Sequence, residues 1–351
     1  MTAPPALSGR TPLHTVRVTA RTTWLLVQQG AGWGELSDIP EAEAARLLGS
    51  SDALPDTFAG RTVAGGLRTA RADAAAREAG LPLADWLSGR TGLPVLRRAI
   101  PLYANINRAV RERTPEAAAD VARAAVAAGY PTVKIAPFDG LTGPDRIGRG
   151  LDIARAVREA IGPGRELLLD AHHLLTVAEL VAHAQEFTAL RLGWLEDTAR
   201  LDDVRGLLRV REAIGAPLAG GEFAATEEEV RPALASGALS VLMPDVKHAG
   251  GPLRVLDLAS LAAEHGVAVS PHNPSGPVAT AASAHVCALL PAGPPLETMF
   301  GEVAWRASAV TPVEPIVSGG YAIGGGAGLG VSPVTSPADG RWGFSRSSPC
   351  P

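Results

Sequence analysis

The sequence predicts a protein of the α/β class: a (β/α)7β barrel, which is a modified TIM barrel, joined to an α+β capping domain. Two observations lead to this prediction. From Pro101 onward, apolar runs of four to six residues alternate with amphipathic segments of 10–16 residues, the pattern of parallel strands joined by crossover helices. Acidic residues also close three successive apolar runs at a constant interval of 26 positions (196 − 170 and 222 − 196), about the length of one strand–helix repeat.

The capping domain is predicted over residues 1–98. Residues 14–29 alternate partly between polar and apolar side chains and are typical of two strands, and the glycine-rich stretch 30–35 predicts a turn leading into a further strand. Residues 40–49 and 64–88 are rich in Ala, Leu and Arg, with apolar positions three or four apart, which predicts two helices. The room between the first two strands is small, so we expect a short loop there and a site that is either more open than usual or closed by a neighbouring subunit.

The barrel is predicted over residues 99–309, with eight strands and seven long helices, so that the helix after the last strand is missing or displaced. The tail 310–351, rich in Gly, Pro and Ser, is expected to return to the capping domain and complete it. The strands are expected near 102–106, 131–136, 166–170, 193–196, 218–222, 240–245, 267–272 and 295–298. The helices are expected near 115–129, 143–161, 176–190, 201–214, 226–236, 252–265 and 277–290.

The composition excludes several classes of protein. The net charge is −4, and no basic stripe with interleaved aromatic residues occurs, which argues against a nucleic-acid partner. Residues 1–15 lack an apolar signal core and no run of ~18 apolar residues is present, which argues against export and against a membrane span. The two cysteines, Cys287 and Cys350, favour a reducing compartment over a disulfide framework. We therefore expect a cytoplasmic protein.

The residues at the predicted strand ends are almost all polar. Barrel enzymes carry their sites at this rim, and a full set of polar residues in register is hard to explain as a series of solvated loop charges. Three converging carboxylates, those of Asp170, Glu196 and Glu222, would repel one another unless a cation lay among them, and hard oxygen ligands suit Mg²⁺. These three residues are therefore the predicted metal ligands. The complete set is Lys134, Asp170, His172, Glu196, Glu222, Asp245, His272 and Glu297.

On these residues the chain resembles the enolase superfamily, in its mandelate racemase branch. The resemblance implies that Lys134 and the metal bind a substrate carboxylate, and that His272, oriented by Asp245, removes the proton α to it. It also implies that Glu297 lies near the substrate carboxylate or the developing enediolate, where acting as a protonated donor would require a raised pKa. The matching segments are 32–35, 133–135, 169–172, 194–197, 219–222, 243–251 and 270–277.

One departure from the family pattern narrows the expected reaction. Family members often carry Lys-x-Lys at the second strand, but here Lys134 is followed by Ile135 and Ala136, and alanine cannot move a proton. The run Asp170-Ala-His172 resembles that of acid-sugar dehydratases of the galactonate and mannonate type, in which the histidine is the general acid on the leaving hydroxyl. His172 is accordingly the predicted acid.

We therefore expect a Mg²⁺-dependent lyase that converts a sugar acid into a 2-keto-3-deoxy acid. A racemase or epimerase of a 2-hydroxy acid, and a catalytically inactive barrel that acts as a binding protein, are the alternatives. The expected partner is a small-molecule carboxylate, not nucleic acid or a membrane, and the chain is expected to form a homo-oligomer. Asn105, Asn107 and Arg306 are predicted to contact the substrate, whereas Lys247 and His248 are predicted to lie in a solvated loop.

Overall fold

A computed structural model describes residues 11–50, 52–291, 293–335 and 343–347. Its eight barrel strands follow one another in the parallel order β11-β4-β5-β6-β7-β8-β9-β10. A hydrogen bond from Ser270 Oγ to the Pro295 carbonyl, 2.8 Å long, joins the ends that follow β10 and precede β11. The strands are β4 (Ala99–Asn105), β5 (Thr132–Ile135), β6 (Glu166–Asp170), β7 (Trp194–Glu196), β8 (Leu218–Gly220), β9 (Val241–Leu242), β10 (Ala268–Val269) and β11 (Leu296–Met299). The predicted α/β barrel is confirmed.

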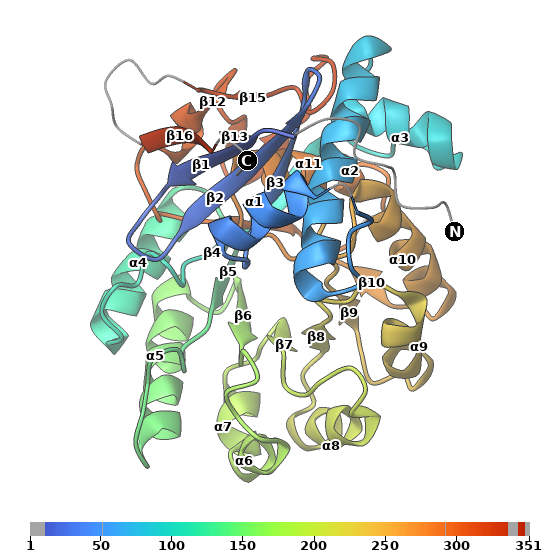
Figure 1. Cartoon of the computed structure of the whole chain (residues 1–351). Helices are drawn as coiled ribbons and strands as arrows, with labels where there is room; N and C mark the ends of the chain where they lie inside the picture. The colour runs from blue at the N-terminus through green and yellow to red at the C-terminus, as the bar shows by residue number, and fades with distance from the viewer. Residues whose placement is uncertain (1–10, 51, 292, 336–342, 348–351) are drawn as a thin grey trace.

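Helices surround the strands, and the capping elements lie above one end of them (Figure 1). Threonine side chains cap several of these helices; Thr176 and Thr226 each form a capping box with a glutamate three residues on. The barrel helices are α4 (Pro115–Ala127), α5 (Arg146–Ile161), α6 (Val177–Ala182), α7 (Ala184–Ala189), α8 (Val204–Ile214), α9 (Glu227–Ala235), α10 (Pro252–Glu264) and α11 (Pro277–Cys287).

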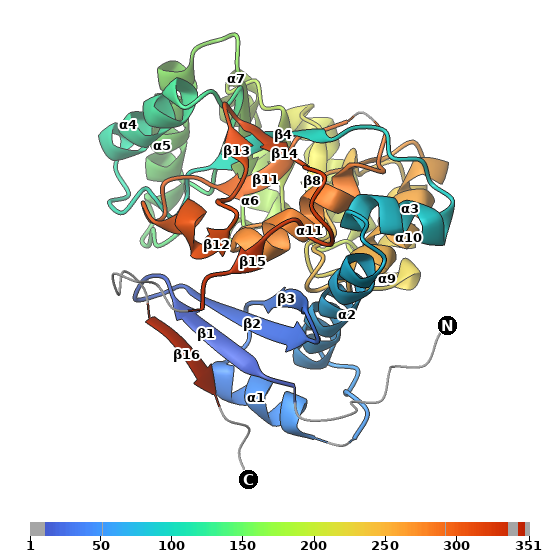
Figure 2. The same ribbon diagram turned by 90° about the horizontal axis from the view of Figure 1, so that it is seen from above.

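The capping sheet has the order β16-β1-β2-β3 and is antiparallel, with the C-terminal strand beside the N-terminal one (Figure 2). A short strand of the tail, β14 (Gly320–Ala322), pairs instead with the start of β4 in the barrel. The capping elements are β1 (Leu13–Arg17), β2 (Thr23–Gln29), β3 (Gly32–Leu36), β16 (Gly343–Ser347), α1 (Glu41–Gly49), α2 (Phe58–Glu78) and α3 (Leu83–Thr91).

Two predicted helices are interrupted. The expected helix 64–88 is two helices, α2 and α3, because Gly80 adopts φ +68° and Pro82 fixes the chain just before α3 begins. The expected helix 176–190 is likewise divided into α6 and α7 at His183. Both errors arise because a periodic apolar pattern continues across a break in the backbone.

Close backbone contacts hold α2 against both of its neighbours. A Cβ on Gly34 of β3 would lie 2.0 Å from the carbonyl oxygen of Gly66, and a Cβ on Gly65 would lie 2.0 Å from that of Lys247, in the loop after β9. Only glycine allows this approach. Helix α2 therefore joins the capping sheet to the barrel at the loop that carries Asp245.

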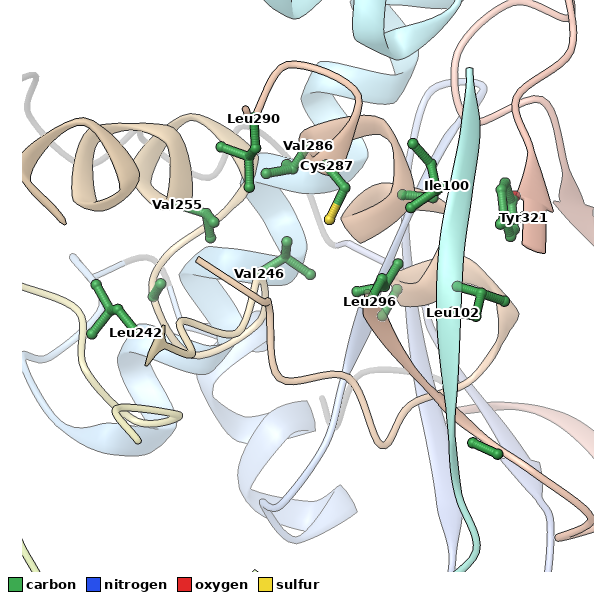
Figure 3. Packing of buried hydrophobic residues seen from close by; sticks show 14 of the residues in the cluster. Ile100, Leu102, Leu242, Val246, Val255, Val286, Cys287, Leu290, Leu296 and Tyr321 are labelled. Carbon is green, nitrogen blue, oxygen red and sulfur yellow. The ribbon is translucent and has the colours of Figure 1, made fainter. Parts of the chain in front are cut away.

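The main core lies between the barrel strands and their helices and continues into the capping domain. Figure 3 shows part of this core, with Ile100 and Leu102 of β4, Leu296 of β11 and Val286 and Cys287 of α11 among the labelled side chains. Cys287 is buried and unpaired, and Cys350 lies outside the described residues. No helix in the described ranges is long and apolar enough to cross a membrane.

His285 links three segments inside this core and is expected to make stability depend on pH. Its Nδ1 accepts from the Ala84 amide at 3.0 Å, and its Nε2 lies 3.3 Å from the Leu329 carbonyl. Burial lowers the pKa of His285 from its usual 6.5 to about 4. Because the native state favours the neutral ring, the stability from this group is complete above the unfolded pKa and is lost as the pH falls towards 4.

Between pH 7.5 and pH 5 the loss from His285 is expected to be about 2 kcal/mol of unfolding free energy, since one pKa unit corresponds to about 1.4 kcal/mol. Urea unfolding at stepped pH measures it. The variant His285→Gln keeps a donor and an acceptor but does not titrate, so its stability should fall less over this range. An equal fall in both proteins would assign the pH dependence to other groups.

Candidate active site

The carboxyl ends of the barrel strands open into a cavity of about 180 Å³, which we call the inner cavity. Its lining combines residues from six barrel strand ends with Asp38 of the capping domain. Seven of the predicted site residues line it directly. Glu196 and Glu297 do not line it but contact Lys134, which does. The lining is Asp38, Asn105, Asn107, Arg108, Lys134, Asp170, His172, Glu222, Phe223, His272, Pro274 and Met299.

Lys134 is the centre of a buried cluster of carboxylates. Its Nζ lies 2.8 Å from Glu196 Oε1, 2.9 Å from Glu297 Oε1 and 3.3 Å from Asp170 Oδ2. The side chain is only 2% exposed. Burial opposes the cation, but the charges of Glu196 and Glu297 raise the pKa of Lys134 well above its usual range. Lys134 is therefore an ammonium that neutralises part of a strongly acidic site.

His272 lies between two carboxylates. Its Nδ1 is 2.9 Å from Asp245 Oδ2 and its Nε2 is 2.7 Å from Glu222 Oε2. Burial disfavours the cation, but the charge of Glu222 and the hydrogen bond to Asp245 raise the pKa of His272 well above its ordinary value. The structure thus contains the predicted pair with Asp245 and holds the other ring nitrogen against a predicted metal ligand.

His172 is held in a similar way by a residue that the sequence analysis did not single out. Its Nδ1 lies 2.7 Å from Asp139 Oδ1, and its Nε2 lies 3.1 Å from Asp170 Oδ2. Burial works against the cation, yet the charge of Asp170 and the bond to Asp139 raise the pKa of His172 to about 11. Asn107 Nδ2 donates to the other oxygen of Asp139 at 2.7 Å. His172 is consequently protonated at neutral pH and fixed in orientation.

Two of the predicted substrate contacts line the inner cavity, but their amide groups are also used within the protein. Asn105 Nδ2 donates to Glu297 Oε1 at 2.7 Å, and Asn105 Oδ1 accepts from the backbone N–H of Asn107 at 2.9 Å. Their contact with a substrate stays a prediction.

The idea of Glu297 as a protonated donor is wrong. Burial alone would raise its pKa, but the ammonium of Lys134 and the charge of His272 lower it below its ordinary value. Glu297 also accepts a hydrogen bond from the Asn273 amide at 2.8 Å. It is an ionised carboxylate that holds Lys134, and it does not line the inner cavity.

Arg306 is not brought to the inner cavity, in contrast to the prediction. Its guanidinium is buried, pairs with both oxygens of Glu314 at 3.0 Å and donates to Thr280 Oγ1 and the Ser275 carbonyl. With its donors used in this way, the side chain fixes the loop before α11 to the segment after β11. Its position just beyond the last strand gives no indication of these contacts.

Lys247 and His248 are buried, so the prediction of a solvated loop is wrong. Lys247 Nζ lies 2.7 Å from Asp245 Oδ2 and also contacts Ser275 Oγ. His248 Nδ1 lies 3.0 Å from Thr62 Oγ1 of helix α2. Because the capping domain covers this loop, residues that would be solvated in an isolated barrel become part of the contact between the domains.

The chemistry of the predicted metal ligands fits Mg²⁺. Asp170 and Glu196 lie opposite each other on adjacent strands, and burial together with the charge of Asp170 raises the pKa of Glu196 well above its usual range. An added cation would relieve this repulsion. Glu222 is turned to His272, so as the side chains stand no group of three His, Cys, Asp or Glu residues within the described ranges converges on one point. Binding by this set stays a prediction.

A family model described as "Enolase C-terminal domain-like" matches residues 116–336, which is more than half of the chain. The chain belongs to the enolase superfamily. Among curated proteins, this superfamily member is 30% identical over 251 residues to D-gluconate dehydratase of Thermoproteus tenax, a match covering 70% of the chain and 49% of the relative. It is 31% identical over 206 residues to D-galactonate dehydratase of Verminephrobacter eiseniae, covering 53% and 52%.

A third relative of this superfamily member is D-galactarolactone cycloisomerase of Agrobacterium fabrum, 34% identical over 131 residues that cover 36% of the chain and 35% of the relative. The chain thus spans about half or less of the length of the curated relatives it matches.

Solved structures of the enolase superfamily share the fold over nearly the whole chain. A member of the superfamily from Salmonella Typhimurium has a TM-score of 0.78 at 18% identity, covering 96% of this chain and 99% of its own. The mandelate racemase/muconate lactonizing enzyme from Jannaschia sp. CCS1 has a TM-score of 0.78 at 24% identity, covering 92% and 94%. The 3,6-anhydro-D-galactonate cycloisomerase from Zobellia galactanivorans has 0.77 at 21%, covering 93% and 97%. At these sequence identities, the similarity to the solved structures shows a shared fold and nothing about the reaction.

Proposed function

We propose that this protein is a Mg²⁺-dependent dehydratase of sugar acids, which removes water from a 2,3-dihydroxy carboxylate to give a 2-keto-3-deoxy acid. One observation carries the proposal: two histidines, each hydrogen-bonded through Nδ1 to an aspartate, line the same small cavity beside a buried lysine. Elimination needs a base on the α-proton and an acid on the β-hydroxyl. The resemblance to gluconate and galactonate dehydratases agrees with this reading.

His272 is the proposed base and His172 the proposed acid. His272 Nε2 takes the α-proton, His172 delivers a proton to the departing β-hydroxyl, which leaves as water, and the resulting enol ketonises. Lys134 balances the charge that develops on the substrate carboxylate. The three assignments are supported by which groups line the inner cavity and by the resemblance to acid-sugar dehydratases.

Asp170, Glu196 and Glu222 are the residues proposed to hold Mg²⁺. When bound, the ion supplies Lewis-acid stabilisation of negative charge on the substrate carboxylate. Glu222 must leave His272 Nε2 before that nitrogen can accept a proton, because the two atoms are 2.7 Å apart in a charged pair. A Glu222 that binds the ion no longer pairs with His272, so the metal and base assignments are compatible with each other.

A screen of sugar acids with Mg²⁺ tests the proposal, with keto-acid formation detected by semicarbazide. The expected result is a keto acid from one or a few stereoisomers, lost on chelation of the metal. The same reactions run in D₂O test the epimerase alternative. In that case the substrate is recovered with deuterium at its α-carbon and no keto acid forms. Failure of every acid to react, together with no heat of Mg²⁺ binding in calorimetry, would favour a binding protein instead.

Asp139 is a positioning residue in this scheme, because it orients His172 without lining the inner cavity. Asp139→Asn should lower the rate of dehydration by about 10- to 100-fold, as is common when a group that orients a catalytic residue is lost. Exchange of the α-proton with solvent, which depends on His272, should continue near the wild-type rate. Equal losses of exchange and of elimination would show general damage to the site and contradict the assignment.

A further inference from the structure

A second and larger cavity adjoins the inner one, and arginines from both domains line it. This outer cavity has a volume of about 850 Å³. Arg21 comes from the short turn between β1 and β2, and Arg108, Arg111 and Arg113 come from the loop between β4 and α4. The turn, although short, therefore brings a positive charge to the entrance of the barrel.

The two cavities are continuous, because Asn107, Arg108 and His172 line both of them. A sugar acid whose carboxylate lies at Lys134 and whose α-carbon lies at His272 must extend past His172, the proposed acid. The inner cavity of about 180 Å³ has little room for the remaining carbons. The far end of such a substrate would therefore lie among the arginines.

Only part of the positive charge in the outer cavity is balanced. Arg108 Nη1 lies 3.3 Å from Glu302 Oε1, and Arg113 Nη2 lies 3.7 Å from Asp139 Oδ2. Asp139 also contacts His172 Nδ1 at 2.7 Å. Glu302 and Asp139 are thus already paired with Arg108 and Arg113 before Arg21 and Arg111 are considered.

The remaining donors have no partner within the described ranges. Nη1 of Arg113 is buried without a hydrogen bond. Arg21 and Arg111 are exposed and form no side-chain hydrogen bond or ion pair there. Burial lowers the pKa of Arg113, Asp139 opposes this change, and the positive charge of Arg21 lowers the pKa further. Arg21 and Arg113 therefore repel each other across the entrance, an arrangement that a bound anion would stabilise.

We propose that the outer cavity is an anion subsite, and that the substrate carries a second anionic group at the end remote from its reacting carboxylate. This inference rests on the proposed function and narrows it. Aldarates, which are sugar acids with a carboxylate at each end, and sugar acids with a terminal phosphate fit this chemistry. Aldonates, which end in a neutral hydroxymethyl group, lack it.

Calorimetric binding in the presence of Mg²⁺ tests the subsite without requiring turnover. The probes form two matched pairs that differ at the terminal carbon. Galactarate is paired with galactonate, and 6-phosphogluconate is paired with gluconate. The dianionic member of at least one pair is expected to bind at least about ten times more tightly, equal to 1.4 kcal/mol. Added salt should weaken this preference. The pair that shows this tighter binding identifies whether the subsite takes a terminal carboxylate or a terminal phosphate.

The double variant R21Q/R111Q removes the two unpartnered exposed charges, and its ratio of affinities for the matched pair should fall towards one. Arg209→Gln, an exposed arginine on α8, is the matched control and should keep the wild-type ratio. Equal binding of both members of each pair, or a preference that survives in R21Q/R111Q, would overturn the subsite. If the subsite is overturned in this way but aldonates still give keto acids, the proposed function stands without it. If the dianionic probes bind more tightly but no sugar acid is turned over, the subsite stands and the proposed function fails.

Discussion

Replacing His272 with asparagine is expected to abolish both dehydration and exchange of the α-proton with solvent. His272 is the cavity-lining group whose Nδ1 is held by a buried aspartate and whose Nε2 lies beside Glu222, one of the predicted metal ligands. Loss of a general base typically costs about 10²- to 10⁴-fold in rate. The measurement is keto-acid release together with deuterium incorporation in D₂O.

His172→Asn is the informative comparison, because it removes the proposed acid and leaves the base. Elimination should be lost while α-proton exchange remains measurable. Persistent exchange in His272→Asn, or loss of exchange in His172→Asn alone, would reverse the two assignments. Circular dichroism and thermal unfolding of both variants separate a chemical defect from a failure to fold.

Lys134→Met is expected to cause the largest combined loss, of activity and of stability. The lysine is the ammonium that contacts three buried carboxylates, and its removal leaves them without that partner. Breaking a buried ion pair by removing one partner typically costs about 3–5 kcal/mol. Denaturant unfolding without added metal measures this loss, and Mg²⁺ should restore part of it by returning positive charge to the cluster.

Lys134→Arg is the matched control for this prediction. It keeps the charge but changes the shape of the donor, so it should fold more stably than Lys134→Met. Wild-type stability of Lys134→Met in metal-free buffer would contradict the role of the lysine as the counter-ion of the site.

The sequence was most informative where chemistry follows a repeating pattern. Asp170 and Glu196 were placed at strand ends by their spacing alone, and the structure sets them in register on adjacent strands. The pairing of His272 with Asp245 followed from the resemblance, and the two side chains do meet. Parallel strands deliver their last residues to one rim, so the position of such residues can be predicted from periodicity.

Residues whose partners are far away in the sequence could not be predicted in this way. Asp139 lies in an irregular loop and gains its role only because that loop returns to His172, 33 positions later. The contact of Arg306 with the Ser275 carbonyl, 31 positions earlier, likewise depends on how the segment after β11 packs. A repeat in the sequence fixes the strands, but it does not specify the paths of the loops between them.

The glycine contact between α2 and the loop after β9 has a consequence for how substrate enters. The Gly65 backbone rests on the Lys247 carbonyl, and Thr62 is hydrogen-bonded to His248 one residue further on. A hinged opening of the capping domain on this side would separate α2 from the loop after β9 and disturb the contacts that support Asp245. Substrate is therefore expected to enter through the outer cavity, where the Thr19–Thr22 turn and its Arg21 form part of the wall.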